Sequence, residues 1–188
     1  MATNSPVQSP EDVVNIALGR IGFKGRIGSL YDGSAMARKA LDLYGQTRDA
    51  VLREFTWGFA ERILAASVSG GIAPAPWSYE YVYPTDCILL RSMFNAQYLS
   101  DKNDPRPTLW TIASSPTKGK VIWTNVAVAT LVYTSQITDP SKWDPQFVER
   151  LVSALARRLA GGAGGPEMMK MEAEEEKVTA QISEGLLG

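Results

Sequence analysis

The chain has 188 residues, 45% hydrophobic and 21% charged, and its 19 basic and 20 acidic residues leave a net charge of −1. This length suits one domain with an extension and can bury a core without disulfides or metals. The near-neutral charge argues against nucleic-acid binding through a basic surface. With no histidine and one cysteine, Cys87, the chain lacks the commonest general base, and it cannot form an intrachain disulfide or a thiolate zinc site.

Membrane insertion and secretion are not indicated by the sequence. No segment approaches the run of about 18 apolar residues that a spanning helix needs. The first residues are polar and lack the basic and apolar regions of a cleaved signal. We therefore expect a soluble protein with no membrane partner and a flexible N-terminus over residues 1–8.

Three stretches combine helix-start signals with apolar residues at helical spacing. Ser9 before Pro10, and Asp144 before Pro145, each place a capping side chain ahead of a proline, whose missing N–H costs nothing in a first turn. Ser34 can cap another helix. We predict helices over 10–21, 35–55 and 144–160.

Arg48 falls inside the apolar stripe of the second predicted helix. One interpretation is that its aliphatic stem covers the edge of the core while its charged end reaches water. The sharper interpretation is an ion pair or an interface contact, because a buried guanidinium needs a partner. We predict an ion pair for Arg48.

The chain changes character at Trp57-Gly58-Phe59-Ala60, where helical periodicity gives way to turn signals and alternation. Two large aromatic rings flanking a glycine can bury much apolar area. We therefore predict that Trp57 and Phe59, together with Arg48, form a structural joint that pins a helix to a sheet.

The region 58–136 is predicted to form a small, mostly antiparallel β domain. Tyr79-Glu80-Tyr81-Val82-Tyr83 alternates as strands do, and Thr117-Lys118-Gly119-Lys120 fits a hairpin turn. Short connections favour antiparallel pairing. Over 57–69 the alanines favour helix and Gly58 favours a break, and we prefer a strand there. The other predicted strands are 79–83, 87–94, 110–113, 121–124 and 126–134.

The predicted fold class is therefore α+β: a helical bundle with a small antiparallel β domain over residues 9–160, followed by a C-terminal helical arm. A glycine-rich hinge opens the arm, which covers 161–188. Its apolar face is thin, and such a helix gains little by packing on its own domain. We expect it to dock on a partner, with methionines as adaptable contacts. The residues expected at that contact are Met168, Met169, Met171, Val178 and Ile182.

No catalytic set, metal site or cofactor is predicted. The glycine run at 161–165 lacks the Gly-Lys-Ser/Thr ending of a phosphate loop and follows a helix. The acidic run at 172–176 is expected to be a solvated helix face rather than a cation site. The tryptophans are interpreted as core and interface residues rather than as a stacking platform. These are Trp57, Trp77, Trp110, Trp123 and Trp143.

A series of short packing motifs runs through residues 11–187. They include Ile16-Ala17-Leu18-Gly19-Arg20-Ile21-Gly22, Ile27-Gly28-Ser29-Leu30, Trp57-Gly58-Phe59-Ala60, Tyr81-Val82-Tyr83-Pro84-Thr85-Asp86-Cys87, Trp123-Thr124-Asn125, Thr138-Asp139-Pro140, Asp144-Pro145-Gln146-Phe147 and Leu155-Ala156-Arg157-Arg158-Leu159-Ala160. Their order and spacing resemble the head-to-tail adaptors of short-tailed phages, also called tail tubular protein A. The Gly/Ala run at 161–165 departs from the family pattern.

The resemblance implies a structural virion protein at the head–tail junction, made in the host cytoplasm. Similar proteins form a ring of twelve copies beneath the portal protein and receive the tail nozzle protein below. DNA passes through the lumen without sequence-specific binding, which suits a near-neutral chain. The C-terminal arm, with the five apolar residues named above, is implied to contact the portal.

Two alternatives come from other classes. One is a cell-wall-degrading enzyme with a carboxylate pair, for which Asp86 and Asp101 lie in predicted loops. The other is a protein-interaction module unrelated to phage. Neither alternative predicts a large ring.

Overall fold

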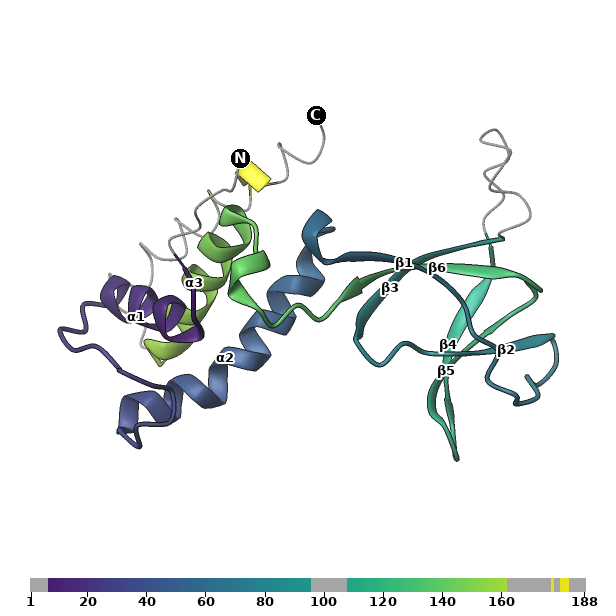
Figure 1. Ribbon diagram of the computed structural model, residues 1–188, viewed down its shortest axis with the longest axis horizontal. Helices are drawn as coiled ribbons and strands as arrows, with labels where there is room; N and C mark the ends of the chain where they lie inside the picture. The colour runs from purple at the N-terminus through teal and green to yellow at the C-terminus, as the bar shows by residue number, and fades with distance from the viewer. Residues whose placement is uncertain (1–6, 96–107, 162–176, 178–179, 183–188) are drawn as a thin grey trace. The chain divides into compact units, whose positions relative to one another are not determined.

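The chain divides into two compact units. The computed structural model describes residues 7–95, 108–161, 177 and 180–182. A helical unit comprises residues 1–59 and 137–188, and a β unit comprises residues 60–136 (Figure 1). The β unit is thus inserted between two parts of the helical unit, whereas the sequence was interpreted as one domain over 9–160. The predicted α+β class is confirmed.

The helices begin at the capping residues that the sequence indicated. The Ser9 hydroxyl accepts from the amide of Asp12, whose carboxylate accepts from the amide of Ser9. Ser34 accepts from the amide of Ala37, and Asp144 caps the third helix. Each observed boundary lies within one residue of the prediction. The helices are α1 (Pro10–Arg20), α2 (Ala35–Glu54) and α3 (Pro145–Leu159).

Helix α3 is the centre of the helical unit, since it packs against both α1 and α2. Its apolar side chains Phe147, Leu151 and Leu155 are fully buried. Arg150 and Ser153, on other sides of the helix, are also buried. Helix α2 runs antiparallel to α3, because Glu54 at its end contacts Arg150 in the first half of α3 and Lys39 near its start donates to the carbonyl of Leu159. Arg20 at the end of α1 contacts Glu149 in the first half of α3. None of the helices in the described residues has the length and apolar character needed to cross a membrane.

The β unit contains the predicted strands, including one in the stretch where helix and strand were both open. A 3₁₀ turn (Gly58–Ala60) leads into that strand, so the preference for a strand is confirmed for residues 61–65. The hairpin predicted at Thr117-Lys118-Gly119-Lys120 joins two antiparallel strands. The strands are β1 (Glu61–Ala65), β2 (Tyr79–Val82), β3 (Cys87–Asn95), β4 (Trp110–Ser115), β5 (Gly119–Thr124) and β6 (Ala129–Ser135).

The strands form two antiparallel sheets that share one core. The first sheet has the order β1-β6-β3 and the second β2-β5-β4. Leu131 and Met93 from the first sheet meet Tyr81 and Ile122 from the second in a single buried cluster. The Tyr81 hydroxyl donates to the carbonyl of Val126, so this buried polar group is satisfied. The opposite face of the first sheet is left outside this cluster.

Candidate interaction sites

The predicted aromatic joint is present, but it joins different elements from those expected. The rings of Trp57 and Phe59 lie 5.3 and 5.1 Å from the ring of Phe147 in α3, both in edge-on arrangements. Trp143 contacts Phe147 from another side at 5.1 Å, and Phe55 contacts Trp57 at 5.4 Å. The prediction of a helix-to-sheet joint is therefore wrong. The rings fasten the chain after α2 to the start of α3, within the helical unit.

Two buried tryptophans donate their ring N–H groups to backbone carbonyls of the helical unit. Trp57 Nε1 donates to the carbonyl of Val51 at 2.9 Å, and Trp143 Nε1 donates to that of Ile137 at 3.0 Å. Both side chains are buried. A stacking platform needs exposed rings, so the interpretation as core residues is confirmed for Trp57 and Trp143.

Arg48 forms an ion pair, with Nη2 2.7 Å from Oδ1 of Asp49 on the same helix. The Arg48 side chain is 11% exposed and that of Asp49 is 34% exposed, so the pair lies at the edge of the core. Tyr44, one turn earlier, is buried, and its hydroxyl has no hydrogen-bond partner among the described residues. Burial raises the pKa of Tyr44.

Two interhelical ion pairs were missed in the sequence. Arg150 lies opposite the apolar stripe of α3, yet it is buried and its Nε lies 2.7 Å from Oε2 of Glu54 in α2. Arg20 in α1 lies 2.6 Å from Glu149 and also donates to Ser153 in α3. The partners lie far apart in the sequence, and no local pattern indicates such pairs.

Four of the five predicted partner-binding residues of the arm lie outside the described residues: Met168, Met169, Met171 and Val178. Ile182 is described and is 1% exposed within its own unit. The expectation that the arm packs little on its own domain therefore does not hold at Ile182.

Ile182 lies at the first turns of α3. Together with Gln181 it lines one side of a hollow of about 210 Å³, whose other walls are Pro145, Gln146 and Glu149. The chain leaves α3 at its far end, after Leu159. Residue 182 is therefore near the opposite end of α3 from Leu159.

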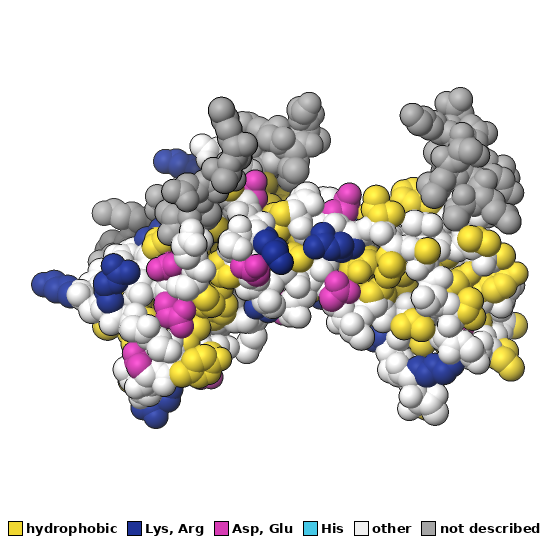
Figure 2. Space-filling view, in the orientation of Figure 1, with side chains coloured by type: hydrophobic (Ala, Val, Ile, Leu, Met, Phe, Trp, Pro, Cys, Tyr) yellow, Lys and Arg dark blue, Asp and Glu magenta, His cyan; other side chains and the backbone are white. Residues whose placement is uncertain are grey.

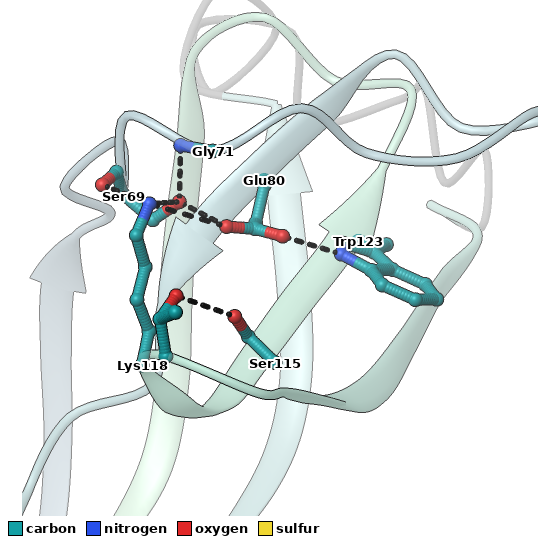
Figure 3. Close-up of polar contacts among 7 residues, drawn as sticks. Ser69, Gly71, Glu80, Ser115, Lys118 and Trp123 are labelled. Carbon is teal, nitrogen blue, oxygen red and sulfur yellow. Dashed lines mark hydrogen bonds and ion pairs between the residues drawn. The ribbon is translucent and has the colours of Figure 1, made fainter.

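A cluster of polar side chains in the β unit surrounds Glu80 (Figure 3). The Ser69 hydroxyl donates to Oε1 of Glu80 at 2.5 Å, and Trp123 Nε1 donates to Oε2 at 2.9 Å. Lys118 Nζ lies 3.7 Å from the same carboxylate and donates to the carbonyl of Ser69 at 2.7 Å. The amide of Gly71 donates to the Ser69 hydroxyl. Strand β2, the 69–71 segment, β5 and the turn before it are thus joined at one carboxylate.

The chemistry of this cluster favours a structural role. Hydrogen bonds from Ser69 and Trp123 and the charge of Lys118 lower the pKa of Glu80 below its usual 4.5. A carboxylate of that kind stays ionised at neutral pH and accepts protons poorly. Ser69 directs its hydrogen to Glu80, whose lowered pKa makes that carboxylate a poor base for activating a nucleophile. In the sequence, Glu80 stands between Tyr79 and Tyr81 in a predicted strand, and no pattern marks it as the centre of a polar cluster.

Asp86, considered for a hydrolytic carboxylate pair, accepts hydrogen bonds from its own sheet. Ser135 Oγ donates to it at 2.8 Å and the hydroxyl of Tyr133 at 3.1 Å. Burial, assisted by the charge of Asp86, raises the pKa of Tyr133 to about 12. Asp101 lies outside the described residues. Asp86 therefore ties the turn before β3 to strand β6.

The β unit presents apolar side chains to solvent, and they gather over this unit in the space-filling view (Figure 2). On the outer face of the first sheet, Ile63 in β1 is 69% exposed and pairs with Val132 in β6, while Phe94 in β3 is 44% exposed. Exposed apolar groups that lie together on one sheet face mark candidate interaction surfaces. We call Ile63, Phe94 and Val132 the outer-face patch.

Comparison of the chain with models of known protein families and with curated proteins found no match.

Proposed function

We propose that this chain is a structural virion protein that assembles into a head-to-tail adaptor ring between a portal and a tail nozzle. The proposal originates in the ordered motifs that resemble short-tailed phage adaptors. The observation that carries it further is the architecture: a helical unit with a small antiparallel β unit inserted between Phe59 and Ile137. A helical bundle with a small β domain is what that resemblance implies.

The outer-face patch is suited to lateral packing. A ring subunit needs two different surfaces that meet between neighbouring copies. Ile63 and Phe94 supply apolar area that the single chain leaves in water. Side chains on this outer face can pack on a neighbour without rearranging the core on the other side of the sheet.

The charge of the chain is compatible with a conduit for DNA. A strongly basic lumen would bind the phosphate backbone through released counterions and hold the DNA in place. The net charge of −1 leaves no large basic excess for such binding.

The decisive experiment is a mass measurement of the full chain, alone and with the portal protein encoded in the same genome. We expect a species on the portal of about twelve times the 20.5 kDa chain mass. The free chain can stay monomeric, since ring closure can require the portal as a template. A chain that stays monomeric with the portal present would contradict the proposal.

A matched pair of variants tests the lateral surface in the same assay. Ile63→Asp places a charge in the outer-face patch and is expected to prevent the ring while leaving the fold intact, since Ile63 is 69% exposed. Tyr31→Asp, at a position 80% exposed in the helical unit, serves as the control. Equal assembly by both variants would exclude the patch as the lateral contact. Turnover of cell-wall polymer by the purified chain would favour the enzyme alternative.

A further inference from the structure

The outer edge of strand β2 is covered by a short segment of the chain. In the order β2-β5-β4, strand β2 is an edge strand. The amide of Val82 donates to the carbonyl of Ser67 at 2.9 Å, and the amide of Ser69 donates to the carbonyl of Glu80 at 3.0 Å. We call residues 67–71 the edge guard. An uncovered edge strand is a template for pairing with other chains, so the guard protects β2.

Apolar burial contributes little to the position of the edge guard. Val68, within the guard, is 64% exposed, and Ile72, directly after it, is 95% exposed. Gly70 has a left-handed φ of +74°, a conformation that favours glycine. Segments with few buried apolar contacts open at a lower free-energy cost than core strands do. The position of the guard therefore depends on its polar contacts.

Those polar contacts converge on the carboxylate of Glu80, which is 5% exposed. Ser69 donates its hydroxyl hydrogen to one oxygen of this carboxylate, and Trp123 donates to the other (Figure 3). Lys118 pairs with the same carboxylate and donates to the backbone carbonyl of Ser69. Among the described residues, Lys118 is the group whose charge acts on Glu80. We call the contacts of Ser69 and Lys118 with Glu80 the latch.

The charge on Glu80 determines the strength of the latch. Hydrogen bonds to an ionised acceptor are roughly twice as strong as those between neutral groups. Protonation of Glu80 weakens the bond from Ser69 and leaves Lys118 without its ionic partner in the latch. The backbone bonds from Val82 and Ser69 then hold an exposed segment that buries little apolar area.

We propose that the edge guard is a movable strap held closed by the latch, and that it opens separately from the rest of the β unit when Glu80 loses its charge. The hydrogen bond from Ser69 is the largest cause of the lowered pKa of Glu80. The latch is therefore complete above pH 4.5 and is released as the pH falls through the lowered folded-state value. All the contacts concerned lie within the β unit, so the inference is independent of the proposed ring.

Amide hydrogen exchange of the full chain, followed by NMR and corrected for the intrinsic exchange rate at each pH, tests the latch. The amides of Ser69 and Val82 report on the guard. Ala66, one residue before it, donates its amide to the carbonyl of Ala129 in β6 and reports on the intact sheet. We expect protection at Ser69 and Val82 to fall by about tenfold or more in acid, while protection at Ala66 is retained.

Two variants separate the latch from a general effect of acid. Glu80→Gln removes the charge and should lower protection at Ser69 and Val82 by about tenfold at neutral pH. Asp86→Asn is the matched control, because Asp86 also accepts hydrogen bonds from side chains, but its donors lie in β6. It should leave the protection of the guard unchanged. The acid titration of the wild-type chain keeps the proposal testable if Glu80→Gln does not fold.

Each outcome supports or overturns the latch. Loss of protection at Ser69 and Val82 with Ala66 still protected, in acid and in Glu80→Gln, supports it. Loss that reaches Ala66 at the same pH would mean that the β unit unfolds as a whole, which would overturn separate opening. Full protection of the guard in Glu80→Gln, or an equal loss in Asp86→Asn, would overturn the role of the Glu80 charge.

Discussion

Arg150 in α3 and Glu54 at the end of α2 form an ion pair, with 2.7 Å between Nε and Oε2. The Arg150 side chain is 10% exposed, whereas that of Glu54 is 34% exposed. Arg150→Ala leaves Glu54 without this partner and removes the packing of the arginine stem. Because Glu54 retains access to water, we expect the free energy of unfolding of the helical unit to fall by about 1–2 kcal/mol. Chemical denaturation followed by tryptophan fluorescence measures this change.

The control for Arg150 is the exposed pair of Lys142 and Asp139 in the same unit. The side chains are 66% and 47% exposed. Lys142→Ala is expected to change stability by no more than about 0.5 kcal/mol. An equal loss from both variants would mean that burial does not distinguish the two pairs.

Phe147 is the common contact of Trp57, Phe59 and Trp143 and has no exposed surface. Phe147→Ala should therefore lower the free energy of unfolding by about 3–5 kcal/mol, through lost burial and the cavity left among the rings. The test is urea denaturation with near-UV circular dichroism, which reports on the tryptophans. Phe23→Ala, at a position 38% exposed, is the control and should cost much less.

Tyr44 carries a buried hydroxyl that has no hydrogen-bond partner among the described residues. Tyr44→Phe removes this group, and we expect stability to stay the same or rise by up to about 1 kcal/mol. Tyr81 is also buried, but its hydroxyl donates to the carbonyls of Val126 and Ala127. Tyr81→Phe should cost about 1 kcal/mol. Thermal unfolding of both variants tests the contrast, which a stabilising Tyr81→Phe would contradict.

Gly71 leaves no room for a side chain. A Cβ atom there would lie 2.0 Å from Oε1 of Glu80 and 3.0 Å from Nζ of Lys118. Gly71→Ala should displace the Glu80 carboxylate and cost about 1–3 kcal/mol. Gly45→Ala, inside α2 with open space around the added methyl, is expected to add about 0.5–1 kcal/mol instead. Denaturant titration measures the change in the free energy of unfolding for each variant. A loss for Gly71→Ala with a gain for Gly45→Ala confirms the expectation, and changes in the same direction contradict it.

Glu80 makes the β unit sensitive to acid. Its pKa in the folded state is lowered, chiefly by the hydrogen bond from Ser69 and then by that from Trp123. The resulting stability is fully present above the usual glutamate pKa of 4.5 and is lost as the pH falls through the lowered folded-state value. Glu80→Gln cannot ionise, so its stability should depend less on pH in that window, at a cost of roughly 1 kcal/mol near pH 7.

The measurement is urea denaturation of both proteins across the acid range, with hydrogen exchange of strand amides reporting on the β unit. Asp12, Asp32 and Asp139 also have lowered pKa values, but they lie in the helical unit. The difference between wild type and Glu80→Gln therefore isolates the β-unit contribution. Parallel pH profiles for the two proteins would argue against a role for Glu80.

Local elements were predictable because their signals lie within a few residues of each other. Ser9, Ser34 and Asp144 cap the helices they precede, and each side chain bonds an amide two or three positions away. The hairpin turn before Gly119 was predictable for the same reason, because it joins two strands that are adjacent in the sequence. The first helix was predicted to end at residue 21, and Gly22 with its positive φ follows directly.

Contacts between distant parts of the chain were not predictable in this way. The joint at Trp57 was recognised as aromatic packing, but its partner Phe147 lies in a helix that the chain reaches only after the whole β unit. Helical periodicity puts Arg150 opposite the apolar stripe of α3, and it shows only the position of a side chain around its own helix. It does not show which other helix covers that side.

The sequence by itself determined where the helices begin and end, most of the strands and the α+β class, because capping, periodicity and turn chemistry act over short separations. Only the tertiary structure decided the pairing of Arg150 with Glu54, the burial of Glu80 and the seat of Ile182 against α3. Each of these depends on burial and on the distance between groups far apart in the chain. Those quantities exist only once the units have folded.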